Sequence, residues 1–103
     1  MYQSVFRPDL FAGQVVVVTG GGSGIGRCIA HELAALGAHV ALVGRDAQKL
    51  QSVQDELAQQ GTQASSHSCD IRDEAAVKAV VEEILTRHGR IDALVNNAGG
   101  QYL

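Results

Sequence analysis

The strongest chemical signal in the chain is a glycine-rich segment, TGGGSGIG, at residues 19–26. Gly20, Gly24 and Gly26 follow a GxxxGxG spacing between a valine-rich run and a helical pattern. Glycines at such a turn leave backbone N–H groups open to a phosphate at the positive end of a helix. The spacing therefore predicts a pyrophosphate-binding loop, with a plain flexible turn as the alternative. The candidate cofactor-binding residues of this loop are Gly20, Ser23, Gly24, Ile25 and Gly26.

Other phosphate-binding motifs fit this segment less well. The glycines do not match a complete GxGxxG pattern, and no Lys-Ser or Lys-Thr pair ends the segment as it does in a P-loop. The glycine-rich segment follows a predicted strand and leads into a predicted helix, which is the context that a dinucleotide-binding loop requires.

A second candidate lies at the end of the next apolar run, where the chain reads Gly44-Arg45-Asp46. Folds that bind NAD place a carboxylate here for the ribose 2′-hydroxyl, and this sequence has Gly44 at that position. Arg45 offers instead a planar cation suited to a 2′-phosphate. Asp46 is better explained as the N-cap of a following helix. We therefore expect NADP(H) rather than NAD(H), unless Arg45 is an ordinary surface arginine.

Two further candidates are weaker when each is taken alone. Asp70 could accept a hydrogen bond from an adenine amino group, and Ile71 could pack against the ring. The segment NNAGG at residues 96–100 supplies amide side chains from Asn96 and Asn97, followed by small residues that would let a ribose or nicotinamide approach the backbone. An ordinary Asn-Gly-type turn is the alternative for this segment.

The elements that must position these residues are short apolar runs that alternate with longer helical patterns. Strands are predicted at residues 14–19, 38–43, 64–69 and 91–96. The run at 64–69 is diluted by serine and histidine, as in an edge strand with one solvated face.

Helices are predicted between these strands, with caps at both ends. Asp46 and Asp73 can cap the second and third helices, and Gly37, Gly61 and Gly89 can end the three. The first helix is expected to be mostly buried, with apolar residues Ile25, Cys28, Ile29, Leu33 and Leu36. The second has a narrow apolar stripe and a solvated outer face, with Leu50, Val53 and Leu57. The buried face of the third is predicted to contain Val77, Val80, Val81, Ile84 and Leu85.

The resulting order, β-α-β-α-β-α-β, is typical of an α/β Rossmann-type doubly wound parallel sheet, here partial. Right-handed crossovers predict the strand order 3-2-1-4, with a reversal between the first and fourth strands. Ligands bind such sheets in the crevice beyond the carboxyl ends of the strands at that reversal. The glycine-rich segment and NNAGG both fall at this crevice.

Composition excludes several other classes of protein. The chain has 103 residues, of which 46% are hydrophobic and 18% charged, as in one compact globular domain. A net charge of −3 leaves no basic stripe for a nucleic acid. The N-terminal residues include Arg7, Pro8 and Asp9, which do not fit a signal peptide, and no apolar run reaches membrane-spanning length. We expect an intracellular protein without nucleic-acid or membrane partners.

Neither cysteine nor histidine shows a metal-binding pattern. Cys28 and Cys69 form no CxxC motif, and the four histidines are scattered without ligand spacing. Both cysteines are interpreted as small buried apolar residues.

Together, TGGGSGIG, the Gly44-Arg45 pair, Asp70 and NNAG resemble in order and spacing the short-chain dehydrogenase/reductase family, over essentially the whole chain. The resemblance implies an NADP(H)-binding Rossmann-type domain of an oxidoreductase that moves a hydride between nicotinamide and its substrate. It implies contacts to pyrophosphate from Gly20, Gly24 and Gly26, and to the 2′-phosphate from Arg45. It also implies contacts to adenine from Asp70 and Ile71, and places Asn96, Ala98 and Gly99 beside the ribose and central sheet.

The opening FRPDLFAGQVVVVTGGGSGIGR and the ending NNAGGQ are more specifically similar to the branch with peroxisomal trans-2-enoyl-CoA reductases, and more loosely to 2,4-dienoyl-CoA reductases. The parent enzyme would then act on a carbonyl, hydroxyl or acyl-CoA substrate, as a cytoplasmic homo-oligomer, or a peroxisomal one if eukaryotic.

The sequence departs from the family in its catalytic residues. The family's Ser and Tyr-x-x-x-Lys follow the NNAG segment, where this chain has only Gln101, Tyr102 and Leu103. No catalytic residue can be assigned, so we expect residues 1–103 to be the N-terminal, cofactor-binding half of a single domain, inactive alone. The alternatives are a stand-alone dinucleotide-binding module and a truncated product without function.

Overall fold

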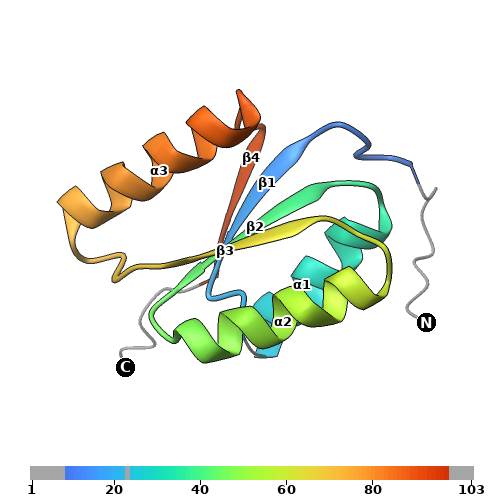
Figure 1. Ribbon diagram of the computed structural model, residues 1–103, viewed down its shortest axis with the longest axis horizontal. Helices are drawn as coiled ribbons and strands as arrows, with labels where there is room; N and C mark the ends of the chain where they lie inside the picture. The colour runs from blue at the N-terminus through green and yellow to red at the C-terminus, as the bar shows by residue number, and fades with distance from the viewer. Residues whose placement is uncertain (1–8, 23, 98–103) are drawn as a thin grey trace.

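Four parallel strands form one sheet in the order β3-β2-β1-β4, as the computed structural model of the chain shows (Figure 1). The structure describes residues 9–22 and 24–97. Helices α1 and α2 cover one face of the sheet and α3 lies on the other (Figure 1). The elements are β1 (Val15–Thr19), α1 (Gly24–Ala35), β2 (His39–Gly44), α2 (Ala47–Gln59), β3 (Ala64–Ser68), α3 (Glu74–His88) and β4 (Ala93–Asn96). The predicted fold class and strand order are confirmed, and every predicted strand differs from the observed one by only one or two residues at its ends.

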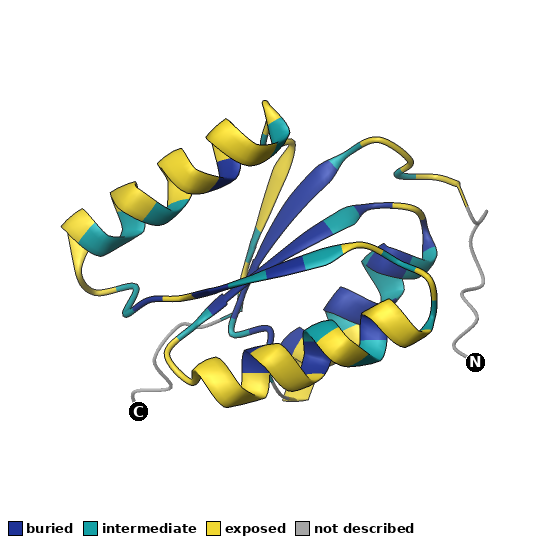
Figure 2. Cartoon of the chain, viewed as in Figure 1, coloured by how far each residue is buried: buried dark blue, intermediate teal, exposed yellow. Residues whose placement is uncertain are grey.

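The two central strands are buried on both faces, which explains why β1 is a continuous apolar run rather than an alternating one (Figure 2). Val16 and Val18 belong to the core cluster with α1 and α2, whereas Val15 and Val17 belong to the cluster that includes Ile84 of α3. Each face of β1 therefore anchors a separate helical layer.

Helix α1 is less buried than predicted, and only part of its predicted apolar face packs against the core. Gly26, Ala30 and Ala34 are buried, whereas Ile25 is 70% exposed and Cys28 is exposed. The predictions that α1 is mostly buried and that Cys28 is a core residue are therefore wrong; Cys69 is buried as expected. Small residues at a spacing of four let the helix lie close to the sheet. Ile29 and Leu33 pack, partly buried, against the same core cluster, and Leu36 is buried just beyond the helix, as predicted.

Helix α2 agrees with the sequence analysis in its caps and its buried stripe. Leu50, Val53 and Leu57 are its buried residues, and the Asp46 carboxylate accepts hydrogen bonds from backbone N–H groups of the first turn. Gly61 has a φ of +77° just beyond the C-cap, so a glycine is favoured there.

Helix α3 is capped as predicted, by Asp73 and by Gly89 in the left-handed conformation. Its predicted buried face is only partly correct, because Ile84 is buried whereas Val81 and Leu85 are exposed. A single helix is too narrow to cover this face of the sheet, and an open apolar groove of about 240 Å³ lies between α3 and Leu94 of β4. Among the described residues, no helix is both long and apolar enough to cross a membrane.

The polar strand β3 is an edge strand, as predicted, but its polar side chains on one face are buried. Ser65 is 3% and His67 is 5% exposed. His67 Nδ1 lies 2.7 Å from Glu83 Oε1 of α3, and His67 Nε2 lies 2.9 Å from Ser65 Oγ. Because each of these buried polar atoms has a partner, the hydrogen bonds offset the cost of removing them from water, and the chain of bonds joins α3 to the sheet edge.

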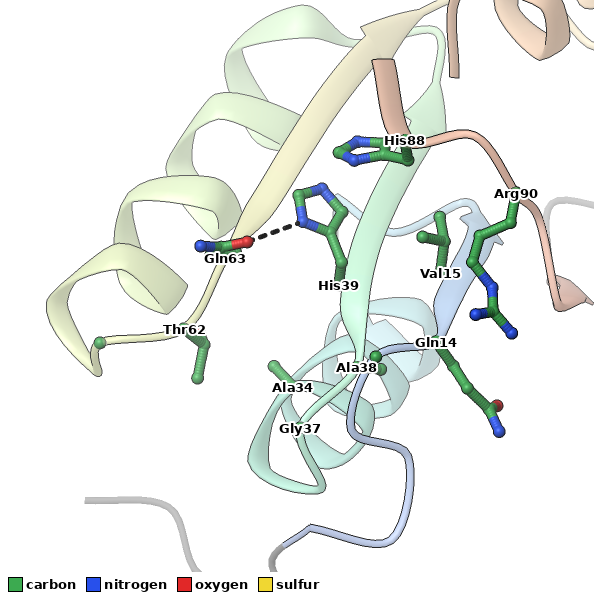
Figure 3. Close-up of a pocket in the computed structure, with 12 residues that line it drawn as sticks. Gln14, Val15, Ala34, Gly37, Ala38, His39, Thr62, Gln63, His88 and Arg90 are labelled. Atoms are coloured by element: carbon green, nitrogen blue, oxygen red, sulfur yellow. Dashed lines mark hydrogen bonds between the residues drawn. The ribbon is translucent and has the colours of Figure 1, made fainter. Parts of the chain in front are cut away.

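A pair of histidines occupies a pocket of about 380 Å³ at the amino-terminal ends of the strands (Figure 3). The rings of His39 and His88 lie 3.9 Å apart, and His39 Nδ1 faces Gln63 Oε1 at 3.5 Å (Figure 3). The Nε2 atoms of both histidines are buried without a hydrogen-bond partner among the described residues. Burial lowers the pKa of both rings, and the charges of His88 and Arg87 lower the pKa of His39 further. The pKa of His88 is lowered additionally by Arg87 and His67.

These lowered pKa values predict that acid destabilises the fold. As the pH falls below the ordinary histidine pKa of 6.5, the unfolded chain takes up protons before the folded chain does, so the free energy of unfolding decreases. Urea unfolding between about pH 7.5 and pH 5.5 should show this loss, and His88→Gln should make it smaller. Lys78→Gln on the exposed face of α3 is the control. An unchanged pH dependence in His88→Gln would show that the pair does not cause the effect.

Strand β4 forms the other edge of the described sheet and is largely exposed (Figure 2). Its Leu94 is 62% exposed. No residue of β4 carries a charge that would discourage pairing with another chain. We expect the 103-residue chain to self-associate through this edge. Size-exclusion chromatography with light scattering should show oligomers that Leu94→Lys reduces and that Leu10→Lys, at an exposed leucine before β1, does not. A monomeric wild-type chain would contradict this.

Candidate functional site

The carboxyl ends of the parallel strands meet at one edge of the sheet, and a pocket of about 250 Å³ lies there between the turns that follow β1, β2 and β3. Three of the predicted site residues, Gly20, Arg45 and Ile71, line this same pocket. Six further lining residues were not predicted as site residues: Gly22, Gly44, Asp46, Lys49, Leu50 and Cys69.

The three motif glycines are required for two different physical reasons. Gly20 and Gly24 have φ angles of +67° and +59°, which residues other than glycine rarely adopt. Gly26 is required because of a close approach: a Cβ atom there would lie 1.9 Å from the carbonyl oxygen of Gly20 and 2.9 Å from Asn97 Nδ2. A Cβ atom on Gly24, in contrast, would meet nothing within 4 Å. The backbone at Gly24 is therefore open to a ligand, while Gly26 fixes helix α1 against the loop. Ser23 lies outside the described residues.

Arg45 directly follows β2, as the sequence predicted, and its backbone is held in place. The Arg45 carbonyl accepts a hydrogen bond from Ser68 Oγ at 3.3 Å, which joins it to the end of β3. Among the described residues, the guanidinium of Arg45 forms no hydrogen bond or ion pair. The neighbouring Asp46 carboxylate accepts from the N–H groups of Gln48 and Lys49, each at 3.1 Å. Its predicted role as a helix cap is confirmed, and Arg45 remains available to an anionic ligand.

Asp70 is bound to a residue that the sequence analysis did not single out. Arg72 donates to both of its carboxylate oxygens, at 3.1 and 3.0 Å, and the Arg72 backbone N–H donates at 2.9 Å. These hydrogen bonds lower the pKa of Asp70 to about 2, and the nearby charge of Arg45 contributes. Asp70 is thus a fixed anion near neutral pH that still has lone pairs to accept a hydrogen bond. Arg72 lies only two residues after Asp70, and this short spacing of opposite charges is the sequence signal that could have identified it.

The residues at the end of β4 are organised by a threonine that was not predicted as part of the site. Thr19 Oγ1 donates to Asn96 Oδ1 at 3.1 Å and accepts from the Asn97 backbone N–H at 2.9 Å. Asn96 lines the groove beside α3 rather than the Arg45 pocket, and Ile25 lies in a separate surface depression over α1. The structure therefore does not bring all predicted site residues around one pocket. Ala98 and Gly99 lie outside the described residues.

The fold and this site define a Rossmann-type protein with a glycine-rich loop at the strand-order reversal. The profile of the short chain dehydrogenase family matches residues 14–103, and the chain belongs to that family.

Individual relatives agree with this assignment. A citronellol catabolism dehydrogenase (AtuB) of Pseudomonas aeruginosa PAO1 is 61% identical with a TM-score of 0.93, over 99% of this chain and 43% of that one. A metagenomic short-chain oxidoreductase solved in complex with NADP is 48% identical with a TM-score of 0.83, over 86% and 40%. A peroxisomal 2,4-dienoyl-CoA reductase of Arabidopsis thaliana is 40% identical over 97% of this chain and 34% of its own length. The chain thus spans about a third of that curated relative.

The contact between Gly26 and Gly20 gives a prediction for stability. Gly26→Ala forces backbone atoms apart and should destabilise the fold by about 3 kcal/mol, the upper end for overpacking. Gly24→Ala is the matched control, because it has open space and bears only the left-handed backbone cost of about 1–2 kcal/mol. Urea unfolding measures both. A Gly26→Ala variant as stable as Gly24→Ala would refute the close-approach argument.

Proposed function

We propose that this chain binds NADP(H) and is the cofactor-binding half of an oxidoreductase. The parent protein would transfer a hydride between nicotinamide and a carbonyl, hydroxyl or enoyl-CoA-type substrate. The observation that carries the proposal is the guanidinium of Arg45 at the pocket edge, which has no hydrogen bond or ion pair among the described residues, with Gly44 at the position where NAD-binding folds place a carboxylate.

The residues present fit a dinucleotide. The loop leaves open space at Gly24, where a Cβ atom would otherwise face the ligand, and it leads directly into helix α1, whose N-terminus favours an anion. In this proposal Gly20, Ser23, Gly24, Ile25 and Gly26 hold the pyrophosphate and Arg45 holds the 2′-phosphate. Asp70 and Ile71 hold the adenine, and Asn96, Ala98 and Gly99 lie beside the ribose. The cofactor itself supplies the hydride chemistry when it is bound.

The relatives support both the cofactor and the range of substrates. One solved relative is a complex with NADP, and relatives include a dehydrogenase of citronellol catabolism and a 2,4-dienoyl-CoA reductase. Because these relatives act on different substrates, the proposal extends to the class of reaction and not to one compound.

Hydride transfer is proposed for the parent protein only. In these 103 residues no tyrosine is followed by a lysine four positions later, so the family's catalytic pair has no counterpart here. The chain by itself is proposed to bind cofactor without turnover. For the parent we propose a homo-oligomer in the cytoplasm, with the peroxisome as the alternative in a eukaryote.

The test of this function is the response of each cofactor to the loss of Arg45. Arg45→Ala should weaken NADPH binding by about 1–3 kcal/mol, the range for a charge-assisted contact, and leave NADH nearly unchanged. Isothermal titration of the chain with each cofactor measures this, and Arg87→Ala on the exposed face of α3 is the control. Equal losses for NADPH and NADH would rule out a 2′-phosphate role for Arg45.

A further inference from the structure

The pocket beside Arg45 contains a second cation that sequence reasoning did not identify. Lys49 lies in the first turn of α2 and lines the same pocket as Arg45 and Gly20. We propose that Lys49 is a second cation for the 2′-phosphate, and that Gly22 is the positioning residue that brings it to the glycine-rich loop. This inference rests on the proposed function, because it names how the same pocket distinguishes NADP(H) from NAD(H).

The position of Lys49 is fixed by its backbone while its side chain stays available. Its N–H donates to Asp46 Oδ1 at 3.1 Å, so the residue is held at the start of the helix. In the part of the chain that the structure describes, its ammonium group forms no hydrogen bond or ion pair. Lys49 and Arg45 thus line one pocket with no hydrogen bond or ion pair to the described side chains, an arrangement that an anionic ligand would stabilise.

The charge balance of the pocket explains why one cation is insufficient. Asp46 places a carboxylate next to Arg45, although its charge is partly offset by the two N–H groups that it accepts from. A phosphate monoester carries a charge of about −1.5 to −2 near neutral pH. The charge of Arg45 alone is balanced by that of Asp46, whereas Arg45 and Lys49 together give the pocket a net positive charge.

Gly22 explains how Lys49 comes so close to the loop. A Cβ atom on Gly22 would lie 2.9 Å from Lys49 Cβ, 3.3 Å from its carbonyl carbon and 3.4 Å from the backbone nitrogen of Leu50. Gly22 stands outside the GxxxGxG spacing, and it does not have a positive φ. Its lack of a side chain is therefore required by the contact with α2. Any larger residue would push the first turn of α2, and Lys49 with it, away from the loop.

Two small probes separate the 2′-phosphate from the rest of the cofactor: 2′,5′-ADP carries it, and 5′-AMP does not. Lys49→Gln should raise the Kd for 2′,5′-ADP about tenfold, as expected for one charge-assisted contact, and leave 5′-AMP within about twofold. Lys78→Gln removes the same charge from α3 and should change neither. The proposal is overturned if Lys49→Gln leaves 2′,5′-ADP binding unchanged, or if it weakens both probes equally.

The wild-type chain separates this proposal from the proposed function. If it binds 2′,5′-ADP no better than 5′-AMP, the NADP(H) assignment fails, and the role of Lys49 fails with it. If the wild type prefers 2′,5′-ADP and Lys49→Gln does not reduce that preference, only the role of Lys49 is wrong.

A second variant tests the positioning role of Gly22. Gly22→Ala should reduce the preference for 2′,5′-ADP in the same direction as Lys49→Gln, and the double variant should lose little more than Lys49→Gln alone, because both act through one contact. Additive losses, or a folded Gly22→Ala chain with wild-type preference, would overturn the positioning role. Circular dichroism identifies a variant that does not fold, and the Lys49→Gln result then decides the proposal.

Discussion

The structure depends on the close approach of helix α1 to the end of β1, at the contact between Gly26 and Gly20. Because the virtual Cβ of Gly26 would lie 1.9 Å from the Gly20 carbonyl oxygen, the helix can reach this position only with glycine at its first turn. The same small-residue face continues through Ala30 and Ala34, so the whole helix lies close to the sheet. Asn97 also packs against Gly26, and the contact therefore joins β1, α1 and the end of β4.

The parallel register then determines which turns can form a site. Since β1, β2 and β3 pair in parallel, their carboxyl ends lie at one edge, and Gly20, Arg45 and Ile71 share a pocket although they are far apart in the sequence. Under the proposed function, the glycine-rich loop and α2 act as one unit, since Gly22 contacts Lys49. The pyrophosphate loop and the cations for the 2′-phosphate would then be positioned by the same contact.

The parts that could be predicted from the sequence are those set by local patterns. Apolar runs, the caps at Asp46 and Asp73 and the left-handed Gly89 are encoded within a few residues, and the strand order follows from crossover handedness. Apolar periodicity places Ile29, Leu33 and Leu36 toward the core correctly, but not Ile25, because the closeness of α1 to the sheet is set by its small residues. The partners of α2 were missed for a similar reason: the contact between Gly22 and Lys49 joins segments that only the tertiary fold brings together.

The two sides of the candidate site differ in the residues that line them. The side after β2 and β3 is lined by the loop, the first turn of α2 and the end of β3, and its carboxylates and backbone groups already have partners. The side after β4 opens into the apolar groove beside α3, where Asn96 and the exposed Leu94 lie. In the proposed function the adenosine and its phosphate would occupy the side after β2 and β3, and the nicotinamide would extend toward the side after β4. Under that proposal the residues that choose the cofactor, Arg45 and Lys49, lie on one side of the site, and the nicotinamide that carries the hydride lies on the other.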